Sequence, residues 1–152
     1  MFIEKKPTIM NKIVTMLLAI MLCLPSCARA DGITISRDRL PKESKTLLDT
    51  YFADKTCVLV KKDNNEYEVV FKGGEKVEFD SRGRWTEIDC LTSAVPADLV
   101  PEQIRAYVLD NYPDNRIVRI ERQNRGYEIR LDNRIELDFN RNFVLTDFDI
   151  DD

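Results

Sequence analysis

The sequence predicts an α+β protein whose single eight-stranded antiparallel sheet carries two helices on one face. Two observations predict this fold. Residues 40–89 and 100–149 resemble each other at a constant offset of sixty residues, without a gap. Within each copy, apolar residues recur first with the period of a helix and then with the period of a strand. We therefore expect a tandem repeat, with repeat one at 33–90, a linker at 91–98 and repeat two at 99–152.

Matched residues support the duplication along the whole repeated segment. They include Pro41/Pro101, Asp54/Asp114, Tyr67/Tyr127, Phe79/Phe139, Thr86/Thr146 and Asp89/Asp149. A unit of this size buries too little surface to be stable alone. We therefore expect the two repeats to share one sheet and to form one domain over residues 31–152.

Each repeat begins with a predicted helix. Pro41 and Pro101 stand where a helix starts, because the first helical turn does not need the N–H that proline lacks. Residues at helical spacing follow in each repeat: Leu40, Ser44, Leu47, Leu48 and Tyr51, then Val100, Ile104, Tyr107, Val108 and Asn111. Asp54 and Asp114 mark the ends of the two helices.

Four short strands are predicted after each helix, because the period of the apolar residues changes from 3.6 to 2. They lie at 56–62, 66–72, 75–80 and 84–90, and at 116–122, 126–132, 134–140 and 143–151. Pairs of turn residues such as Asn64-Asn65 and Gly73-Gly74 separate the strands. Connections this short join antiparallel neighbours, so each repeat is a helix followed by a four-stranded meander.

The alternation within the strands assigns side chains to two faces. The face under the helices should hold Val58, Val60, Tyr67, Val69, Phe71, Val77, Phe79, Thr86 and Ile88, and in the second repeat Val118, Ile120, Tyr127, Ile129, Leu131, Leu137, Phe139, Thr146 and Phe148. The opposite face, called the open face below, should be charged and exposed to solvent.

Trp85 is the only tryptophan, and the alternation places it on the open face beside Glu87 and Asp89. An aromatic residue among charges is typical of a binding surface, although it also fits an aromatic that only stabilises its cross-strand neighbours. We predict a partner-binding site made of Trp85, Glu87, Asp89, Val70, Leu59 and Leu145.

Cys57 and Cys90 are the two cysteines of the predicted folded part. The alternation puts them on opposite faces of the sheet. Their strands would be the first and fourth of a meander, about 14 Å apart at ~4.8 Å per step, which is beyond disulfide reach. We expect two free thiols.

Residues 1–30 have the features of a signal peptide. Lys12 precedes a short apolar run at 13–24, Pro25 ends this run, and Ala28-Arg29-Ala30 supplies a small-x-small cleavage pattern. The run is shorter than the ~20 residues that span a bilayer. We expect cleavage before Asp31 and a periplasmic or secreted protein with no membrane span.

A second interpretation of this segment is a lipobox. Leu24-Pro25-Ser26-Cys27 would then leave Cys27 as a lipid anchor of a membrane-bound lipoprotein. Proline is a poor residue at the middle of a lipobox, whereas the Ala-x-Ala pattern fits secretion well. Both interpretations lead to the cell envelope.

Charge and composition exclude several classes of function. Cleavage before Asp31 leaves 19 basic and 26 acidic residues, a net charge of −7, so nucleic acid is not an expected partner. The chain has no histidine, which removes histidine triads, histidine metal ligands and imidazole catalysis. Phosphate-binding loops, CxxC pairs and GxSxG motifs are also missing. We expect a protein that is not an enzyme and uses no cofactor.

The acidic C-terminal strand leaves one alternative open. Asp147, Asp149 and Asp151 alternate with apolar residues, as in a half-buried terminal strand. Three carboxylates on one strand face could attract Ca²⁺, but calcium needs 6–8 oxygens from a curved loop. We expect no metal site, with a cation at the acidic strand ends as the alternative.

The run from Gly74 to Cys90, with Ala94-Val95-Pro96-Ala97 and Asn111-Tyr112-Pro113-Asp114, resembles the PepSY-like, β-lactamase-inhibitor-like domain of exported bacterial proteins. The resemblance covers residues 33–152. It implies a helix-plus-four-strand tandem fold similar to that of β-lactamase inhibitory protein, which binds its enzyme with a sheet face. No inhibitor motif matches this sequence, so the resemblance does not imply β-lactamase as the target.

These observations lead to two hypotheses of function. The first is an exported, non-enzymatic module that binds an envelope or extracellular protein or peptide through the open face, with inhibition of the partner as one effect that such binding allows. The second is an envelope structural or stress protein that binds a small ligand or a cation at the acidic strand ends.

Overall fold

The computed structural model describes residues 32–150 of the chain, which belong to one compact unit. The predicted signal peptide at 1–30, the lipobox Cys27 and the terminal Asp151 lie outside the described residues. No helix of the described part is long and apolar enough to cross a membrane.

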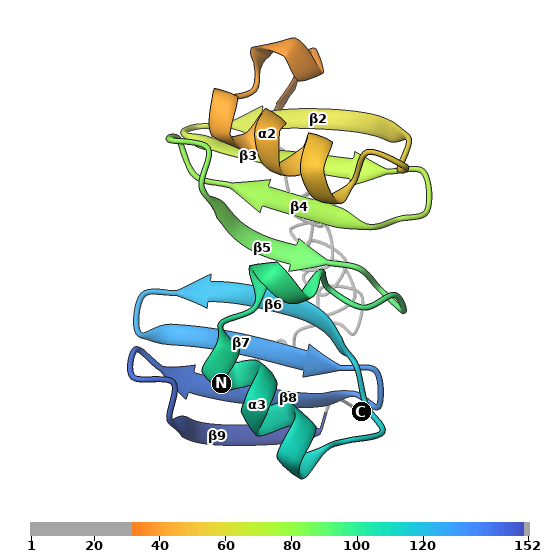
Figure 1. Cartoon of the computed structure of the whole chain (residues 1–152). Coiled ribbons are helices and arrows are strands. Elements are labelled where there is room, and N and C mark those ends of the chain that lie inside the picture. Colours follow the sequence, from red (N-terminus) through yellow and green to blue (C-terminus); the bar gives the residue numbers. More distant parts are fainter. Residues whose placement is uncertain (1–31, 151–152) are drawn as a thin grey trace, which may run out of the picture. The chain divides into compact units, whose positions relative to one another are not determined.

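A single antiparallel sheet forms the fold, and its strands follow one another in chain order (Figure 1). The strands are β1 (Ile33–Thr34), β2 (Cys57–Asp63), β3 (Glu66–Phe71), β4 (Lys76–Phe79), β5 (Trp85–Asp89), β6 (Ile117–Gln123), β7 (Gly126–Leu131), β8 (Ile135–Asn140) and β9 (Leu145–Ile150). The α+β class and the single sheet are confirmed. The predicted number of eight strands is wrong, because β1 adds a ninth strand beside β2. Two residues are too few to show an alternating pattern.

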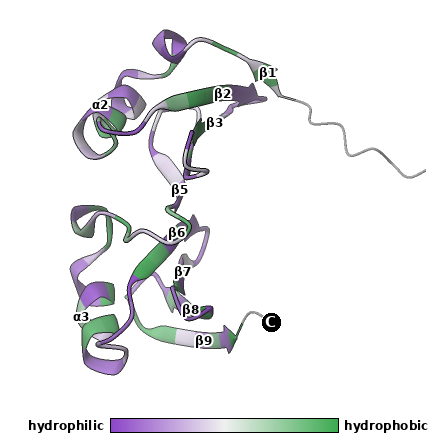
Figure 2. Cartoon of the chain, turned by 90° about the vertical axis from the view of Figure 1, so that its right-hand side faces the viewer, coloured by the Kyte–Doolittle hydropathy of each residue, from purple (hydrophilic) through white to green (hydrophobic). Residues whose placement is uncertain are grey.

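Two helices, α2 (Lys42–Tyr51) and α3 (Glu102–Asn111), lie on the same face of the sheet (Figure 2). Each starts directly after its proline, and each is preceded by a short 3-10 turn, at Arg37–Arg39 and Ala97–Leu99. Leu48 of α2 and Ile104 of α3 are fully buried against the sheet. Apolar residues at helical spacing therefore contact the sheet, as the sequence predicts.

Four β-bulges interrupt the alternation of the strands. Val58 and Thr86 are the extra residues of the first two: Cys57 pairs with Phe71 and Leu59 with Val70, while Glu78 pairs with Glu87 and Phe79 with Trp85. The other two lie sixty residues later, at Val118 and Thr146. A bulge adds one residue to one strand only, so every side chain beyond it changes face.

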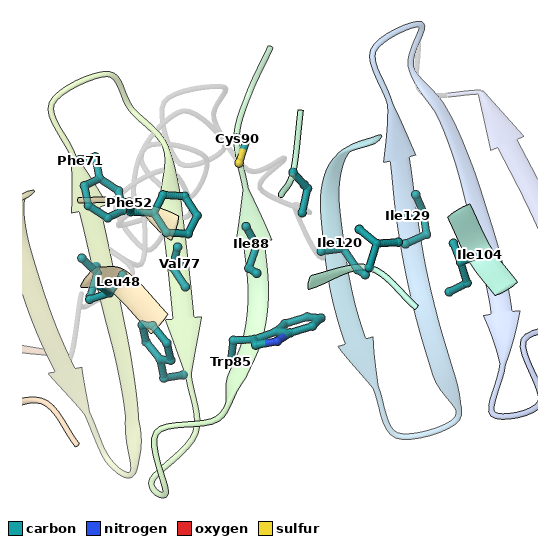
Figure 3. Packing of buried hydrophobic residues seen from close by; sticks show 14 of the residues in the cluster. Leu48, Phe52, Phe71, Val77, Trp85, Ile88, Cys90, Ile104, Ile120 and Ile129 are labelled. Carbon is teal, nitrogen blue, oxygen red and sulfur yellow. The ribbon is translucent and has the colours of Figure 1, made fainter. Parts of the chain in front are cut away.

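The bulges explain most errors in the predicted core. Trp85 is 5% exposed and belongs to the hydrophobic core, where Figure 3 shows its indole extending from β5 toward β6. Leu145 packs against the same core in the second half. Val58, predicted to be buried, is 57% exposed, and Thr146 is exposed as well. The open-face positions predicted for Trp85 and Leu145 are therefore wrong.

Phe148 departs from the prediction for a different reason. Its position opposite Leu137 places it on the face that the helices cover, as expected. It is nevertheless 64% exposed, because β9 is the last strand of the described sheet and has a neighbour on one side only. The alternation gives the face of a side chain but does not say whether a neighbouring strand covers it.

Both cysteines of the described part are free thiols. Cys57 packs against the core, because the bulge at Val58 changes its face, so the predicted difference in face between the two cysteines is wrong. Their strands, however, stand three steps apart in the sheet, as predicted. Cys90 is buried, and burial raises the pKa of its thiol to about 11.

Alkylation should distinguish the two thiols. We expect iodoacetamide at pH 8 to modify the partly exposed Cys57 in the folded protein and to leave Cys90 unmodified, because a thiol with a pKa of about 11 is almost entirely protonated. For the protein of residues 31–152, which lacks Cys23 and Cys27, mass spectrometry should find one adduct in the native state and two after denaturation. Equal rates for both thiols, or fewer than two adducts after denaturation, would contradict this assignment.

Candidate functional site

The open face of the sheet carries an uninterrupted row of carboxylates. Strand register places Glu68, Glu78, Glu87, Glu121, Glu128, Asp138 and Asp147 side by side across seven successive strands, from β3 to β9. We call these seven residues the acidic row. Neighbouring strands are about 4.8 Å apart, so each carboxylate lies beside another of the same charge. Lys61 continues the row on β2 and lies 3.2 Å from Glu68.

A second row runs parallel to the acidic row and contains most of the bases of the face. It consists of Leu59, Val70, Lys76, Asp89, Arg119, Arg130, Glu136 and Asp149. We call it the mixed row. Its apolar end lies on β2 and β3, and its bases lie on β4, β6 and β7. Together with Lys61, the two rows contain ten carboxylates and four bases.

Arg119 of β6 binds three members of the acidic row at once. Its guanidinium donates hydrogen bonds to Glu87 at 3.1 Å and to the carboxylates of Glu121 and Glu128. The side chain is only 16% exposed, so these ion pairs are partly shielded from water. Burial alone would raise the pKa of Glu87, but the hydrogen bond and the charge of Arg119 outweigh it and hold the pKa below its ordinary value.

Lys76 has the corresponding role on β4. Its ammonium group lies 2.8 Å from Glu78 and 3.2 Å from Glu87, so Glu87 lies between two bases. In the mixed row, Arg130 binds Asp89 at 3.2 Å. The centre of the open face is therefore a connected network of ion pairs rather than a set of isolated charges.

The acidic row is poorly compensated toward β9. Asp138 lies between Glu128 and Asp147 in register, and its Oδ1 atom is buried without a hydrogen-bond partner among the described residues. Burial, together with the charges of Glu128 and Asp147, raises the pKa of Asp138. Burial also raises the pKa of Glu121, and the neighbouring glutamates add to this effect despite Arg119. Crowded carboxylates of this kind favour an external positive charge.

Neutralising Asp138 should stabilise the protein. A carboxylate whose pKa is raised by folding contributes stability below its unfolded pKa and loses that contribution as the pH rises through the folded value. At pH 7 Asp138→Asn should therefore increase stability by about 0.5 kcal/mol, and the gain should disappear near pH 3. Thermal melting at both pH values measures it.

Asp110→Asn on the exposed side of α3 is the matched control and should change neither melting curve. A loss of stability in Asp138→Asn at pH 7 would show that the carboxylate is favourably bound in the folded protein.

The structure brings together four of the six predicted site residues. Leu59, Val70 and Asp89 lie in the mixed row, and Glu87 lies in the acidic row. Trp85 and Leu145 lie on the other face, as described above. The sequence analysis predicted a charged open face but did not identify the acidic row. The alternation within each strand, combined with the register that the turns set between strands, would have shown that these carboxylates lie in one row.

No group of three or more acidic or cysteine side chains between residues 32 and 150 is arranged to hold a metal ion. Asp147 and Asp149, two of the three carboxylates considered for a cation, accept hydrogen bonds from the backbone N–H groups of Phe148 and Ile150. Their oxygens are thus engaged with the backbone of their own strand.

One family profile and several solved structures of Bacteroides proteins are similar to this chain. Residues 65–147 match the family described as "Putative beta-lactamase-inhibitor-like, PepSY-like". A "putative calcium-regulated periplasmic protein" of Bacteroides thetaiotaomicron is 38% identical with a TM-score of 0.75, over 78% of this chain and 97% of that chain. No curated protein sequence matches the chain.

Two solved structures from Bacteroides vulgatus extend the comparison. A putative periplasmic protein of the DUF2874 family is 38% identical with a TM-score of 0.77, over 80% of this chain and 98% of that chain. A putative periplasmic protein of unknown function is 28% identical with a TM-score of 0.74, over 78% and 98%. The matched family profile covers more than half of the sequence, and these structures cover the described sheet and helices. The chain belongs to the PepSY-like, β-lactamase-inhibitor-like family.

Proposed function

We propose that the chain is an exported, non-enzymatic binding module that recognises an envelope or extracellular protein or peptide through the open face of its sheet. The observation that carries this proposal is the acidic row, which crosses seven strands on a face that neither helix covers. The family and the periplasmic neighbours support the export and the absence of catalysis.

The charges of the face define the partner. Ten carboxylates against four bases, Lys61 included, leave the open face strongly acidic, so the partner presents a basic surface. Glu87 and Asp89 would contact that surface near the centre of the sheet. Leu59 and Val70, at the apolar end of the mixed row, would contact an apolar part of the same partner. An enzyme bound in this way would be inhibited if its active site lay under the face.

Partner capture followed by charge removal tests this proposal. The protein is used to isolate binding partners from an envelope extract, and the affinity of each purified partner is measured at several salt concentrations. Glu78→Gln/Glu121→Gln removes two charges from the acidic row, whereas Glu43→Gln/Glu102→Gln removes two exposed charges from the helices. We expect the first variant to bind several-fold more weakly with a smaller salt dependence, and the second to bind like the wild type. Equal binding by both variants would contradict recognition by the open face.

Export requires removal of the leader. We propose cleavage before Asp31, supported by the Ala28-Arg29-Ala30 pattern. Intact mass measurement of the protein from an envelope fraction distinguishes the two processing routes. A mass that begins at Asp31 supports a periplasmic or secreted product, and an acylated Cys27 would instead establish a lipid-anchored one.

A second candidate function is the binding of a small ligand or a cation at the acidic strand ends. It is favoured by the name of the related calcium-regulated protein and by the crowded carboxylates Asp138 and Asp147. Calorimetric titration with Ca²⁺, with Mg²⁺ for comparison, tests it. Heat that is specific for Ca²⁺ and lost in Asp138→Asn would support cation binding, and the absence of such heat would contradict it.

The two halves of the sheet also support the proposed tandem duplication. α2 and α3 span residues exactly sixty positions apart, β2 and β6 likewise, and the bulges recur with the same offset. A β-lactamase-inhibitory-protein-like arrangement of two helix-plus-four-strand units is the fold that this duplication implies. Expression of residues 99–152 alone tests the energetic interdependence of the repeats: we expect this half to be unfolded.

A further inference from the structure

Among residues 32–150 no strand pairs with the outer edge of β9, although the equivalent edge of β5 is paired with β6. Phe148 and Ile150 of β9 are 64% and 61% exposed. Sixty residues earlier, Ile88 and Cys90 are 0% and 4% exposed, because β6 covers that edge and places Ile120 opposite Ile88. The same structural position is thus buried in one half and exposed in the other.

The backbone shows the same difference. The N–H of Cys90 donates to the carbonyl of Val118 in β6 at 2.8 Å, as expected where two strands pair. The equivalent N–H of Ile150 has no strand beside it among residues 32–150 and donates to its neighbour Asp149 Oδ1 at 2.7 Å. The N–H of Phe148 donates in the same way to Asp147 Oδ1 at 2.9 Å. Two side-chain carboxylates occupy the donors that an added strand would use.

We propose that β9 binds an extended peptide with alternating basic and apolar residues, which adds to the sheet as an antiparallel strand. This site lies along the outer edge of β9, where it shares Asp147 and Asp149 with the open face, and it goes beyond the proposed function. The peptide would cover Phe148 and Ile150 with its apolar residues and take over the outward N–H groups. Its basic residues would pair with the carboxylates of Asp147 and Asp149 as these leave the backbone. Such strand addition is a common mode of peptide recognition.

The pairing of β5 with β6 supplies the template for this ligand. Arg119 lies opposite Asp89 and binds Glu87, while Ile120 lies opposite Ile88. The equivalent residues of β9 are Asp149, Asp147 and Phe148. A strand that places a basic residue and then an apolar residue opposite them would repeat a contact that the protein already makes.

Charge selects against a second copy of the chain as the occupant. β9 paired with itself in antiparallel register would place Asp147 and Asp149 opposite carboxylates of the other copy. Like charges directly opposite each other destabilise a strand pair. A neutral peptide would also be disfavoured, because it would displace both carboxylates from their backbone donors without providing a new partner.

The test uses the peptide of residues 116–123 with Gln in place of Glu121, because the template register would otherwise put that glutamate opposite Asp147. Its binding to the whole protein is measured by fluorescence anisotropy, and amide hydrogen exchange locates it. We expect saturable binding with a Kd below about 1 mM. The amides of Phe148 and Ile150 should exchange at least tenfold more slowly in the complex. No binding, or binding without protection of these two amides, would overturn the proposal.

Variants distinguish recognition by the β9 edge from nonspecific hydrophobic binding of the peptide. Phe148→Ser should weaken peptide binding about tenfold, whereas Val58→Ser, which removes an equally exposed apolar side chain from the β2 bulge, should leave it unchanged. Asp147→Lys/Asp149→Lys should lose the template peptide and bind a peptide that carries Glu in place of Arg119. If this charge exchange failed, Asp147 and Asp149 would not select a basic peptide, and the proposal would be contradicted.

Two further measurements separate this site from its alternatives. Glu78→Gln/Glu121→Gln, which alters the open face away from the edge, should bind the template peptide normally even if the open face proves to have no partner. Protection of the Phe148 and Ile150 amides that increases with protein concentration, without peptide, would identify a second copy as the occupant and overturn the proposal.

Discussion

Trp85→Ala should destabilise the protein about as strongly as Phe79→Ala, by ~3–5 kcal/mol. The indole is 5% exposed, lies opposite Phe79 of the adjacent strand β4 and belongs to the core that both helices cover. The guanidinium of Arg122 stacks on its ring at 3.6 Å from the centroid, which adds a cation–π contact at the edge of the core. Urea denaturation followed by circular dichroism measures the loss.

Trp85→Phe is the matched variant, because it keeps an aromatic ring while removing part of the volume. We expect it to lose clearly less stability than Trp85→Ala. If Trp85→Ala unfolded within ~1 kcal/mol of the wild type, the indole would not be packed as the structure has it. Strict alternation in the sequence, which places Trp85 on the open face, predicts such a small loss. The experiment therefore also tests whether the bulge at Thr86 turns Trp85 into the core.

Arg119→Gln should be the most destabilising single change on the open face, at roughly 2 kcal/mol or more at pH 7. The substitution leaves Glu87, Glu121 and Glu128 close together with their main base removed. The loss should be smaller than for a fully buried pair, because all three carboxylates keep some contact with water. Lys76 remains beside Glu87, and Gln123 remains hydrogen-bonded to Glu128.

The pH dependence of this loss follows from the pKa of Glu87. A carboxylate whose pKa is lowered by folding contributes stability above its unfolded pKa, and this contribution is lost as the pH falls through the folded value. Without Arg119, only Lys76 would oppose the effect of burial, so the pKa of Glu87 should be higher than in the wild type. The difference in stability between wild type and Arg119→Gln should therefore be largest at neutral pH and should narrow below about pH 4.5.

Unfolding curves at pH 7 and pH 4 measure this difference. Arg105→Gln, on the exposed side of α3, is the matched control and should be nearly neutral at both pH values. A deficit in Arg119→Gln that stays constant with pH would mean that the lost packing of the arginine stem, rather than its charge, is responsible.

The sequence predicts the order and type of nearly all elements, because periodicity depends on local spacing. It also predicts the separation of apolar and charged faces wherever a strand is regular, as in Glu87 and Asp89. It fails where one extra residue enters a strand: Thr86 alone moves Trp85 from the expected open face into the core. No residue near Thr86 in the sequence marks that bulge, because it is the burial of the Trp85 indole in the core that stabilises it.

The acidic row was within reach of the sequence but required information from distant segments. Each carboxylate, such as Glu121 or Asp138, looks like an ordinary solvated charge on its own strand. Their alignment depends on the register of six successive strand pairs, which the turns set one after another. The exposure of Phe148 depends instead on the absence of a neighbouring strand from the described sheet, which the alternation cannot indicate.

The strands follow one another in the sheet in the same order as in the chain. This order determines how the molecule would respond to a mechanical load. Because the first strand, β1, and the last, β9, lie at opposite edges of the described sheet, tension applied to its two ends acts across the strands. The hydrogen bonds of an edge strand would then break one after another, as in a zipper, rather than all together in shear. A weak force would suffice to peel the sheet from both edges. The pairing of β5 with β6, at its centre, would be the last to separate.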